Sequence, residues 1–164
     1  MVSNYYTWSN IKKGAIIYPV GDTIAALILG EFSIYRMLGI MFVGSTFYAV
    51  EIPNYFLWIN RKVPEVVSNF ANSIKRTILA ILYFNPIWIT RHLFFINIFS
   101  GNWDQINYSL FSTSVWSFLI AMPVVLPANY IIQNKLSYRW RFIGSSVFSG
   151  LMVIYFALSK TLLE

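Results

Sequence analysis

The sequence predicts an all-α integral membrane protein, a bundle of four to five transmembrane helices with proline and glycine breaks. Of its 164 residues, 57% are hydrophobic and only 11% are charged, whereas a soluble domain carries about 25% charged residues. The hydrophobic runs are too long for strands and lack the alternation of a β-barrel. Most Lys and Arg residues stand in short segments between these runs. We therefore expect residues 1–164 to form a single membrane domain.

Five hydrophobic runs are candidate spans, since a helix needs about 20 apolar residues to cross the hydrocarbon core. The first run is near the short limit, and the second is long enough to cross with tilt. The fourth contains Pro123 and Pro127, each of which deletes a helical hydrogen bond. In a membrane, neighbouring helices and polar side chains can satisfy the freed carbonyls. The five expected spans are residues 14–30, 37–59, 76–99, 108–133 and 140–158.

The basic residues are distributed unequally between the two sides of the membrane if all five runs cross it. One side then receives Lys12, Lys13, Arg61, Lys62, Lys75, Arg76, Lys135, Arg139 and Arg141, and the other receives only Arg36 and Lys160. This asymmetry would disappear if one of the runs did not cross. The basic loops 60–76 and 134–141 are therefore expected to share one side, the cytoplasm or the mitochondrial matrix.

Five of the polar residues inside the expected spans are the candidate functional residues. They are Asp22, Glu51, Arg91, His92 and Asn129. Intramembrane ionisable groups are costly and usually face a bundle interior or a water-filled cavity. Asp22 or Glu51 could pair with Arg91 and hold helices together, or these groups could line a path for a solute or proton.

The sequence contains no recognisable catalytic or metal-binding motif. It has one histidine, no cysteine, no glycine-rich phosphate loop and no nucleophile elbow. We expect neither enzymatic activity nor a metal or cofactor. The positive charges stand in separate loops rather than on one face, so a nucleic-acid partner is not expected either.

Several residues recur in the order and spacing of a known membrane-protein family. The family opens with a proline, two residues and Gly-Asp, and here the proline stands one residue closer, as Pro-x-Gly-Asp. A proline followed six residues later by Asn-Tyr closes the series. The matched residues are Pro19, Gly21, Asp22, Arg36, Pro53, Trp58, Arg61, Pro64, Lys75, Arg76, Pro86, Pro123, Asn129, Tyr130 and Arg139. In these the chain resembles the family of the 22-kDa peroxisomal membrane protein and its mitochondrial inner-membrane, Mpv-type relatives, as a divergent member.

The resemblance implies a small-solute or ion pore in an organellar membrane, either mitochondrial or peroxisomal. The family is usually drawn with four spans, whereas the charge distribution here favours five. The chain also departs from the family, because Ala80-Ile81 stands where the family has Asp-Gln and Met122 where it has Trp. Polar residues that could line a path in relatives are therefore apolar here.

Two functions follow from these observations. The first is a non-catalytic accessory subunit packed inside a larger inner-membrane assembly, and the second is the pore that the resemblance implies. We expect the lipid bilayer and other membrane-protein subunits as partners, with phospholipid at the basic loops. A subunit should hold Asp22, Glu51 and Arg91 in closed pairs, whereas a pore should leave them around a continuous wet cavity.

Overall fold

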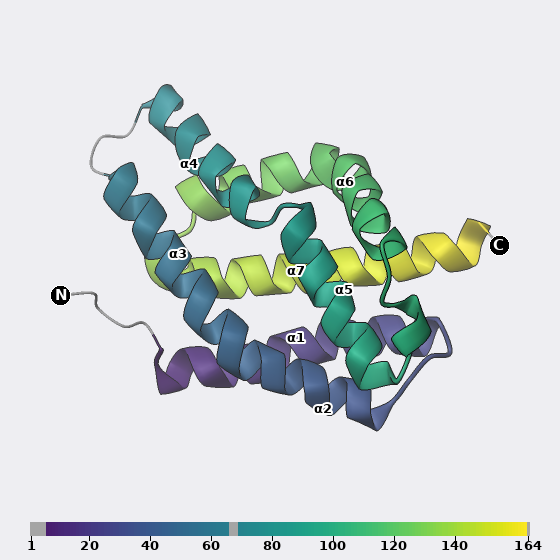
Figure 1. Ribbon diagram of the computed structural model, residues 1–164. Helices are drawn as coiled ribbons and strands as arrows, with labels where there is room; N and C mark the ends of the chain where they lie inside the picture. The colour runs from purple at the N-terminus through teal and green to yellow at the C-terminus, as the bar shows by residue number, and fades with distance from the viewer. Residues whose placement is uncertain (1–5, 66–68, 164) are drawn as a thin grey trace. The chain divides into compact units, whose positions relative to one another are not determined.

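The computed structural model describes residues 6–65 and 69–163, and in these ranges it contains helices and turns but no strand (Figure 1). The all-α expectation is thus confirmed for the described residues. The helices are α1 (Trp8–Ile28), α2 (Ile34–Val43), α3 (Ala49–Lys62), α4 (Phe70–Tyr83), α5 (Pro86–Ser100), α6 (Ser109–Asn134) and α7 (Tyr138–Leu163). Two short helices join them, the π-helical η1 (Gly44–Tyr48) and the 3₁₀-helical η2 (Trp103–Gln105).

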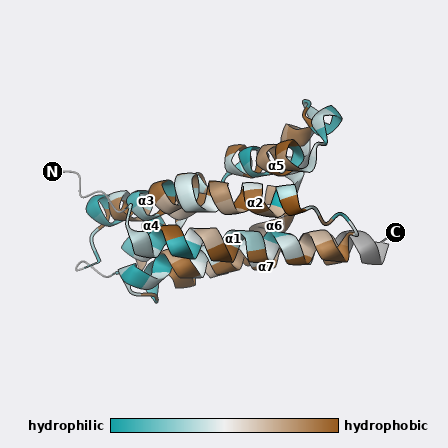
Figure 2. Ribbon diagram, turned by 90° about the horizontal axis from the view of Figure 1, so that it is seen from below, coloured by the Kyte–Doolittle hydropathy of each residue, from teal (hydrophilic) through white to brown (hydrophobic). Residues whose placement is uncertain are grey.

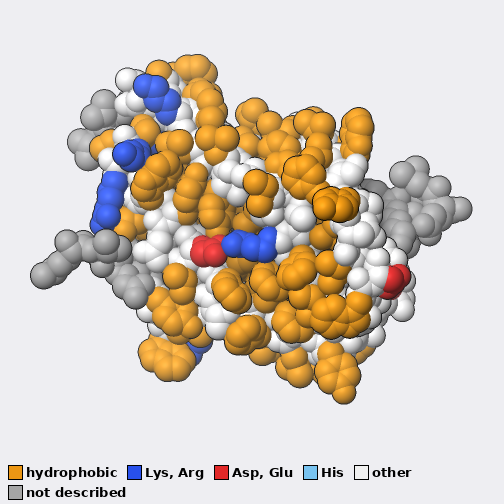
Figure 3. All heavy atoms as spheres, viewed as in Figure 1, with side chains coloured by type: hydrophobic (Ala, Val, Ile, Leu, Met, Phe, Trp, Pro, Cys, Tyr) orange, Lys and Arg blue, Asp and Glu red, His pale blue; other side chains and the backbone are white. Residues whose placement is uncertain are grey.

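Among the described residues, three helical stretches are long and apolar enough to cross a membrane. They are Phe70–Ser100, Ser109–Asn134 and Tyr138–Leu158. Apolar residues also run along most of α1 and α7 (Figure 2), and hydrophobic side chains cover much of the face in Figure 3. These features are typical of a membrane protein, because a soluble protein rarely exposes contiguous apolar surface of this extent.

The chain folds as two compact units. The first comprises Met1–Ile52 and Phe142–Glu164, and the second comprises Pro53–Arg141. The boundaries fall within α3 and within the first turn of α7. The expected basic loop 60–76 includes residues 66–68, which lie outside the described residues.

Two expected spans depart from a single regular α-helix. The second is a continuous helical stretch in which η1 separates α2 from α3. The third is divided into α4 and α5 at Asn85, whose Oδ1 accepts hydrogen bonds from the backbone N–H groups of Ile87 and Trp88. Pro86 follows at the first helical position, where its missing N–H costs nothing. An Asn-Pro pair therefore starts a new helix here.

Glycine contacts hold the first unit together. A Cβ built on Gly14 of α1 would lie 2.0 Å from the carbonyl oxygen of Gly44, and one built on Gly21 would lie 2.7 Å from the Cα of Gly150 in α7. The backbones of α1, η1 and α7 can approach this closely only because no side chain intervenes. Tyr18 packs beside these contacts.

Tyrosine hydroxyls join elements of the second unit. The hydroxyl of Tyr55 in α3 donates to the carbonyl of Leu79 in α4 at 2.7 Å, and that of Tyr138 donates to the carbonyl of Pro53 at 2.7 Å. These bonds connect segments 24 and 85 residues apart in the sequence. Each phenol is thereby partly buried with its polar tip satisfied.

Candidate functional site

The most complete polar arrangement in the first unit is an ion pair between Asp22 and Arg36. Arg36 Nε donates to Asp22 Oδ2 at 2.8 Å, and its Nη2 donates to Oδ1 at 2.7 Å. The two side chains are only 2% and 7% exposed. The geometry is bidentate, which is the strongest form of an arginine–carboxylate interaction. Glu31 adds a longer contact of 3.5 Å to Arg36 Nη1 from a side chain that is half exposed.

The two members of this pair lie on consecutive helices, before and after the turn that joins α1 to α2. Asp22 stands in the C-terminal half of α1, and Arg36 stands in the first turn of α2, whose N-cap is Ser33. The turn between the helices brings α2 back along α1 (Figure 1). The long arginine side chain can therefore reach a carboxylate inside the preceding helix.

The structure gives Asp22 a different partner from the expected one. Sequence reasoning offered Arg91 and placed Arg36 in a loop on the other side of the membrane. Arg36 instead lies within α2 and is buried. A usable signal is present in the sequence, because an acid in one helix and a base just after the following short turn can meet when two helices pack antiparallel.

The other candidate residues are divided between the two units. Glu51 is half-buried in the first turn of α3, in the first unit. His92 of α5 is 8% exposed and stacks on Trp88, with ring centroids 5.5 Å apart. Asn129 of α6 is 3% exposed, and its Nδ2 donates to the carbonyl of Val125 at 2.9 Å. Asp22 and Glu51 thus belong to the first unit, and Arg91, His92 and Asn129 belong to the second.

A buried arginine in the second unit donates hydrogen bonds to three other residues. Arg76 in α4 is 2% exposed, although sequence reasoning treated it as a loop cation. Its Nε donates to Asn134 Oδ1 at 2.9 Å, and its other nitrogens donate to the Pro64 carbonyl and to Ser73 Oγ, both at 3.3 Å. All three acceptors are neutral. Asn134 also donates to Thr77 Oγ1 at 3.2 Å, so one amide joins α4 to the end of α6.

A second buried arginine in this unit has a carboxylate partner. Arg141, 1% exposed, places Nη2 2.6 Å from Glu65 Oε1, and its Nε donates to the carbonyl of Leu136 at 3.3 Å. Its Nη1 has no hydrogen-bond partner among residues 6–65 and 69–163. Glu65 is 43% exposed, so the pair extends from the interior toward the surface.

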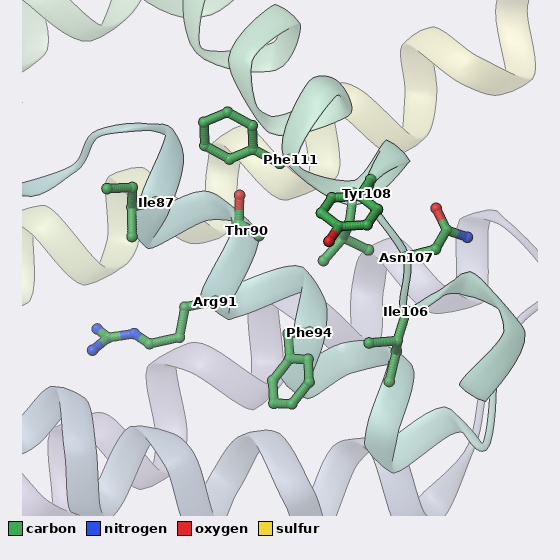
Figure 4. Close-up of a pocket in the computed structure, with 9 residues that line it drawn as sticks. Ile87, Thr90, Arg91, Phe94, Ile106, Asn107, Tyr108 and Phe111 are labelled. Carbon is green, nitrogen blue, oxygen red and sulfur yellow. The ribbon is translucent and has the colours of Figure 1, made fainter.

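A cavity of about 540 Å³ lies between α5 and the start of α6 (Figure 4). Its walls are mostly apolar, and its polar members are Thr90, Arg91, Asn107 and Tyr108. Arg91 extends away from Tyr108 and Phe111 in Figure 4. Thr90 Oγ1 donates to the carbonyl of Pro86 at 2.8 Å. The volume is within the range of small-molecule sites, but few polar groups face it.

The chain was compared with family models, with curated proteins and with solved structures. None of them matches.

Within the first unit, the Asp22–Arg36 pair joins α1 to α2. Asp22 makes its hydrogen bonds to Arg36 through both carboxylate oxygens, so no free base projects from it into a cavity. No group of three His, Asp or Glu side chains within residues 6–65 and 69–163 could hold a metal ion.

Proposed function

We propose that this chain is a non-catalytic accessory subunit of a larger assembly in an organellar membrane, with the mitochondrial inner membrane as the first choice. In this proposal four or five helical segments cross the bilayer, and the basic loops face the matrix. The likeness to the 22-kDa peroxisomal membrane protein family remains part of the proposal, and the peroxisomal membrane is the alternative location.

The closed Asp22–Arg36 pair is the observation that carries the proposal. A group that serves a solute path needs a face open to water, whereas this carboxylate is 2% exposed and bonded through both oxygens. In this proposal the pair fixes the register of α2 against α1. Such a pair suits a protein whose task is to keep one shape inside an assembly.

Exposed apolar side chains support the same proposal. Large hydrophobic side chains on α1, α2, α6 and α7 remain open, among them Ile16, Tyr35, Trp116, Ile120 and Leu151. Lipid can cover such surface, and so can neighbouring subunits. An accessory subunit would use part of it for contacts with its partners.

Native gel electrophoresis of the tagged protein, solubilised mildly from its own membranes, tests the proposal. Migration with a fixed set of co-migrating proteins is the expected result. A matched sample carrying Arg36→Met should lose that band, because the unpaired Asp22 would loosen α1 from α2. Migration of the natural chain as a monomer or small homo-oligomer would overturn the subunit assignment.

The alternative function is a small-solute or ion pore, and the cavity beside Arg91 is the observation that favours it. A pore lined there should conduct in planar bilayers, and Arg91→Gln should change its preference between anions and cations. Asp22→Ala should then act only through stability, since Asp22 does not line this cavity. Absence of conductance from pure, monodisperse protein would leave the subunit proposal alone.

A further inference from the structure

The four prolines that stand inside helices differ in their burial. Pro19 in α1 and Pro53 in α3 are buried, so their own chain covers the backbone around them. Pro123 and Pro127 in α6 are both exposed. The prolines of α1 and α3 are therefore covered by other residues of this chain, whereas the two prolines of α6 are not.

Each proline in α6 frees one backbone carbonyl. Proline has no N–H, so the carbonyl four residues earlier loses its helical donor. Pro123 thereby frees the Leu119 carbonyl, and Pro127 frees that of Pro123 itself. The two oxygens lie one helical turn apart along the same row of residues.

This row lies on the open face of α6. Trp116, Leu119, Ile120 and Val124 surround it and are 63%, 52%, 63% and 52% exposed. The opposite side of the helix is buried, with Ala121 at 6% and Asn129 at 3%. Successive residues are about 100° apart around a helix, which places these buried positions away from the two prolines.

Two freed carbonyls on an apolar face do not suit contact with lipid alone. Acyl chains have no hydrogen-bond donor, and an unsatisfied backbone group in hydrocarbon costs several kcal/mol. The side chains beside the two oxygens are aliphatic or aromatic, apart from the indole N–H of Trp116. Hydrogen-bond donors on a neighbouring helix would satisfy both oxygens.

We infer that the exposed face of α6 around Pro123 and Pro127 docks a transmembrane helix of a partner subunit that carries hydroxyl, amide or indole N–H donors. Its donors bind the carbonyl oxygens of Leu119 and Pro123, while its apolar residues pack on Ile120 and Val124. The inference rests on the proposed accessory role and adds to it the surface and the chemistry of the partner.

Site-specific photo-crosslinking tests the docking face in the intact membrane. A diazirine side chain replaces Ile120 on this face, and a second protein carries it at Leu151 of α7, which is also exposed and apolar but has no proline in its helix. We expect one discrete protein adduct from position 120, mapped to a membrane helix with Ser, Thr, Asn, Gln or Trp within one turn of the joined residue.

A double variant gives the decisive comparison. Pro123→Ala with Pro127→Ala restores both N–H donors, so the helix satisfies its own carbonyls and the partner loses its acceptors. Each lost interhelical bond should lower the yield of the adduct about threefold, and both together roughly tenfold. Val124→Ala is the matched control, because it shortens a side chain on the same face but leaves both carbonyls free, and it should lose less.

A lower yield of the adduct would not reflect misfolding of the double variant, since alanine is far more favourable than proline inside a helix. The double variant should resist heat at least as well as the natural chain. A lipid adduct or an adduct within the same chain at position 120 would overturn the docking face, as would an unchanged yield in the double variant. If the protein still migrates in a large complex, the accessory role stands and only the face is wrong.

Discussion

Arg36 donates two parallel hydrogen bonds to the carboxylate of Asp22, at 2.7 and 2.8 Å, and thereby ties the start of α2 to the interior of α1. Neither charge has appreciable contact with solvent. A buried ion pair contributes little net stability, but removal of one member leaves an uncompensated charge. Substitution of one member should therefore lower the stability of the protein strongly, whereas apolar replacement of both members together should lower it little.

Arg36→Met should destabilise the protein by about 3–5 kcal/mol, since Asp22 would remain buried without its partner. The measurement is the denaturation midpoint of the protein purified in mild detergent. Asp22→Leu combined with Arg36→Met should recover most of the loss, because both charges are then gone. A double variant as unstable as the single one would show that the pair has a role beyond charge balance.

The contact between Gly21 and Gly150 provides a matched pair of substitutions. A Cβ on Gly21 would lie 2.7 Å from the Cα of Gly150, whereas a Cβ on Gly150 would lie 3.4 Å from the Cα of Gly21. Gly21→Ala must push α1 away from α7 and should cost about 1–3 kcal/mol. Gly150→Ala makes ordinary contact and should cost less. Heat-induced aggregation of the two variants would compare them directly, and equal losses would contradict this packing.

The helical class was accessible from the sequence because it depends on local properties. Long apolar runs, few charges and the positions of proline determine helices without reference to tertiary contacts. The break before α5 was visible as Asn85-Pro86, although its capping role was not foreseen. The breaks inside α6 were also visible, since Pro123 and Pro127 stand alone in an apolar run.

The partners of the buried arginines were not accessible in the same way. Arg36, Arg76 and Arg141 were treated as loop cations because each stands beside an apolar run. Their burial depends on which acceptors neighbouring segments bring to them, and that depends on the rotation and register of helices. A count of charges per loop contains no such information.

Glu65 and Glu31 are similarly exposed but should differ in importance. Glu65 pairs with Arg141, which is 1% exposed, and no other carboxylate contact to Arg141 occurs among residues 6–65 and 69–163. Glu31 contacts Arg36, which keeps its bond to Asp22. Glu65→Gln should therefore lower stability more than Glu31→Gln, whose effect should stay within about 1 kcal/mol. Denaturant titration of both variants would reveal the order, and the reverse order would be incompatible with the structure.

Arg76 should not be replaceable by lysine. Its guanidinium reaches Asn134, Pro64 and Ser73 together, and a lysine ammonium is a compact charge without this planar fork. Arg76→Lys should reduce the amount of folded protein, whereas Lys75→Ala at the exposed neighbouring position should leave it nearly unchanged. Limited proteolysis of membranes would compare them, with faster cleavage expected for the lysine variant alone. Equal cleavage of both would show that Arg76 acts as a charge only.

Cysteine labelling can test whether residues 14–30 and 37–59 both cross the membrane, and the natural chain contains no cysteine that would interfere. Asn102→Cys and Ser137→Cys mark the two ends of α6, a helix of 26 residues, and both positions are exposed. An impermeant maleimide should therefore label them from opposite sides of sealed vesicles. With five crossings, Lys12→Cys should be labelled from the same side as Ser137→Cys, as the distribution of basic residues requires. Labelling of Lys12→Cys together with Asn102→Cys would instead mean that only one of residues 14–30 and 37–59 crosses and that four segments span the bilayer.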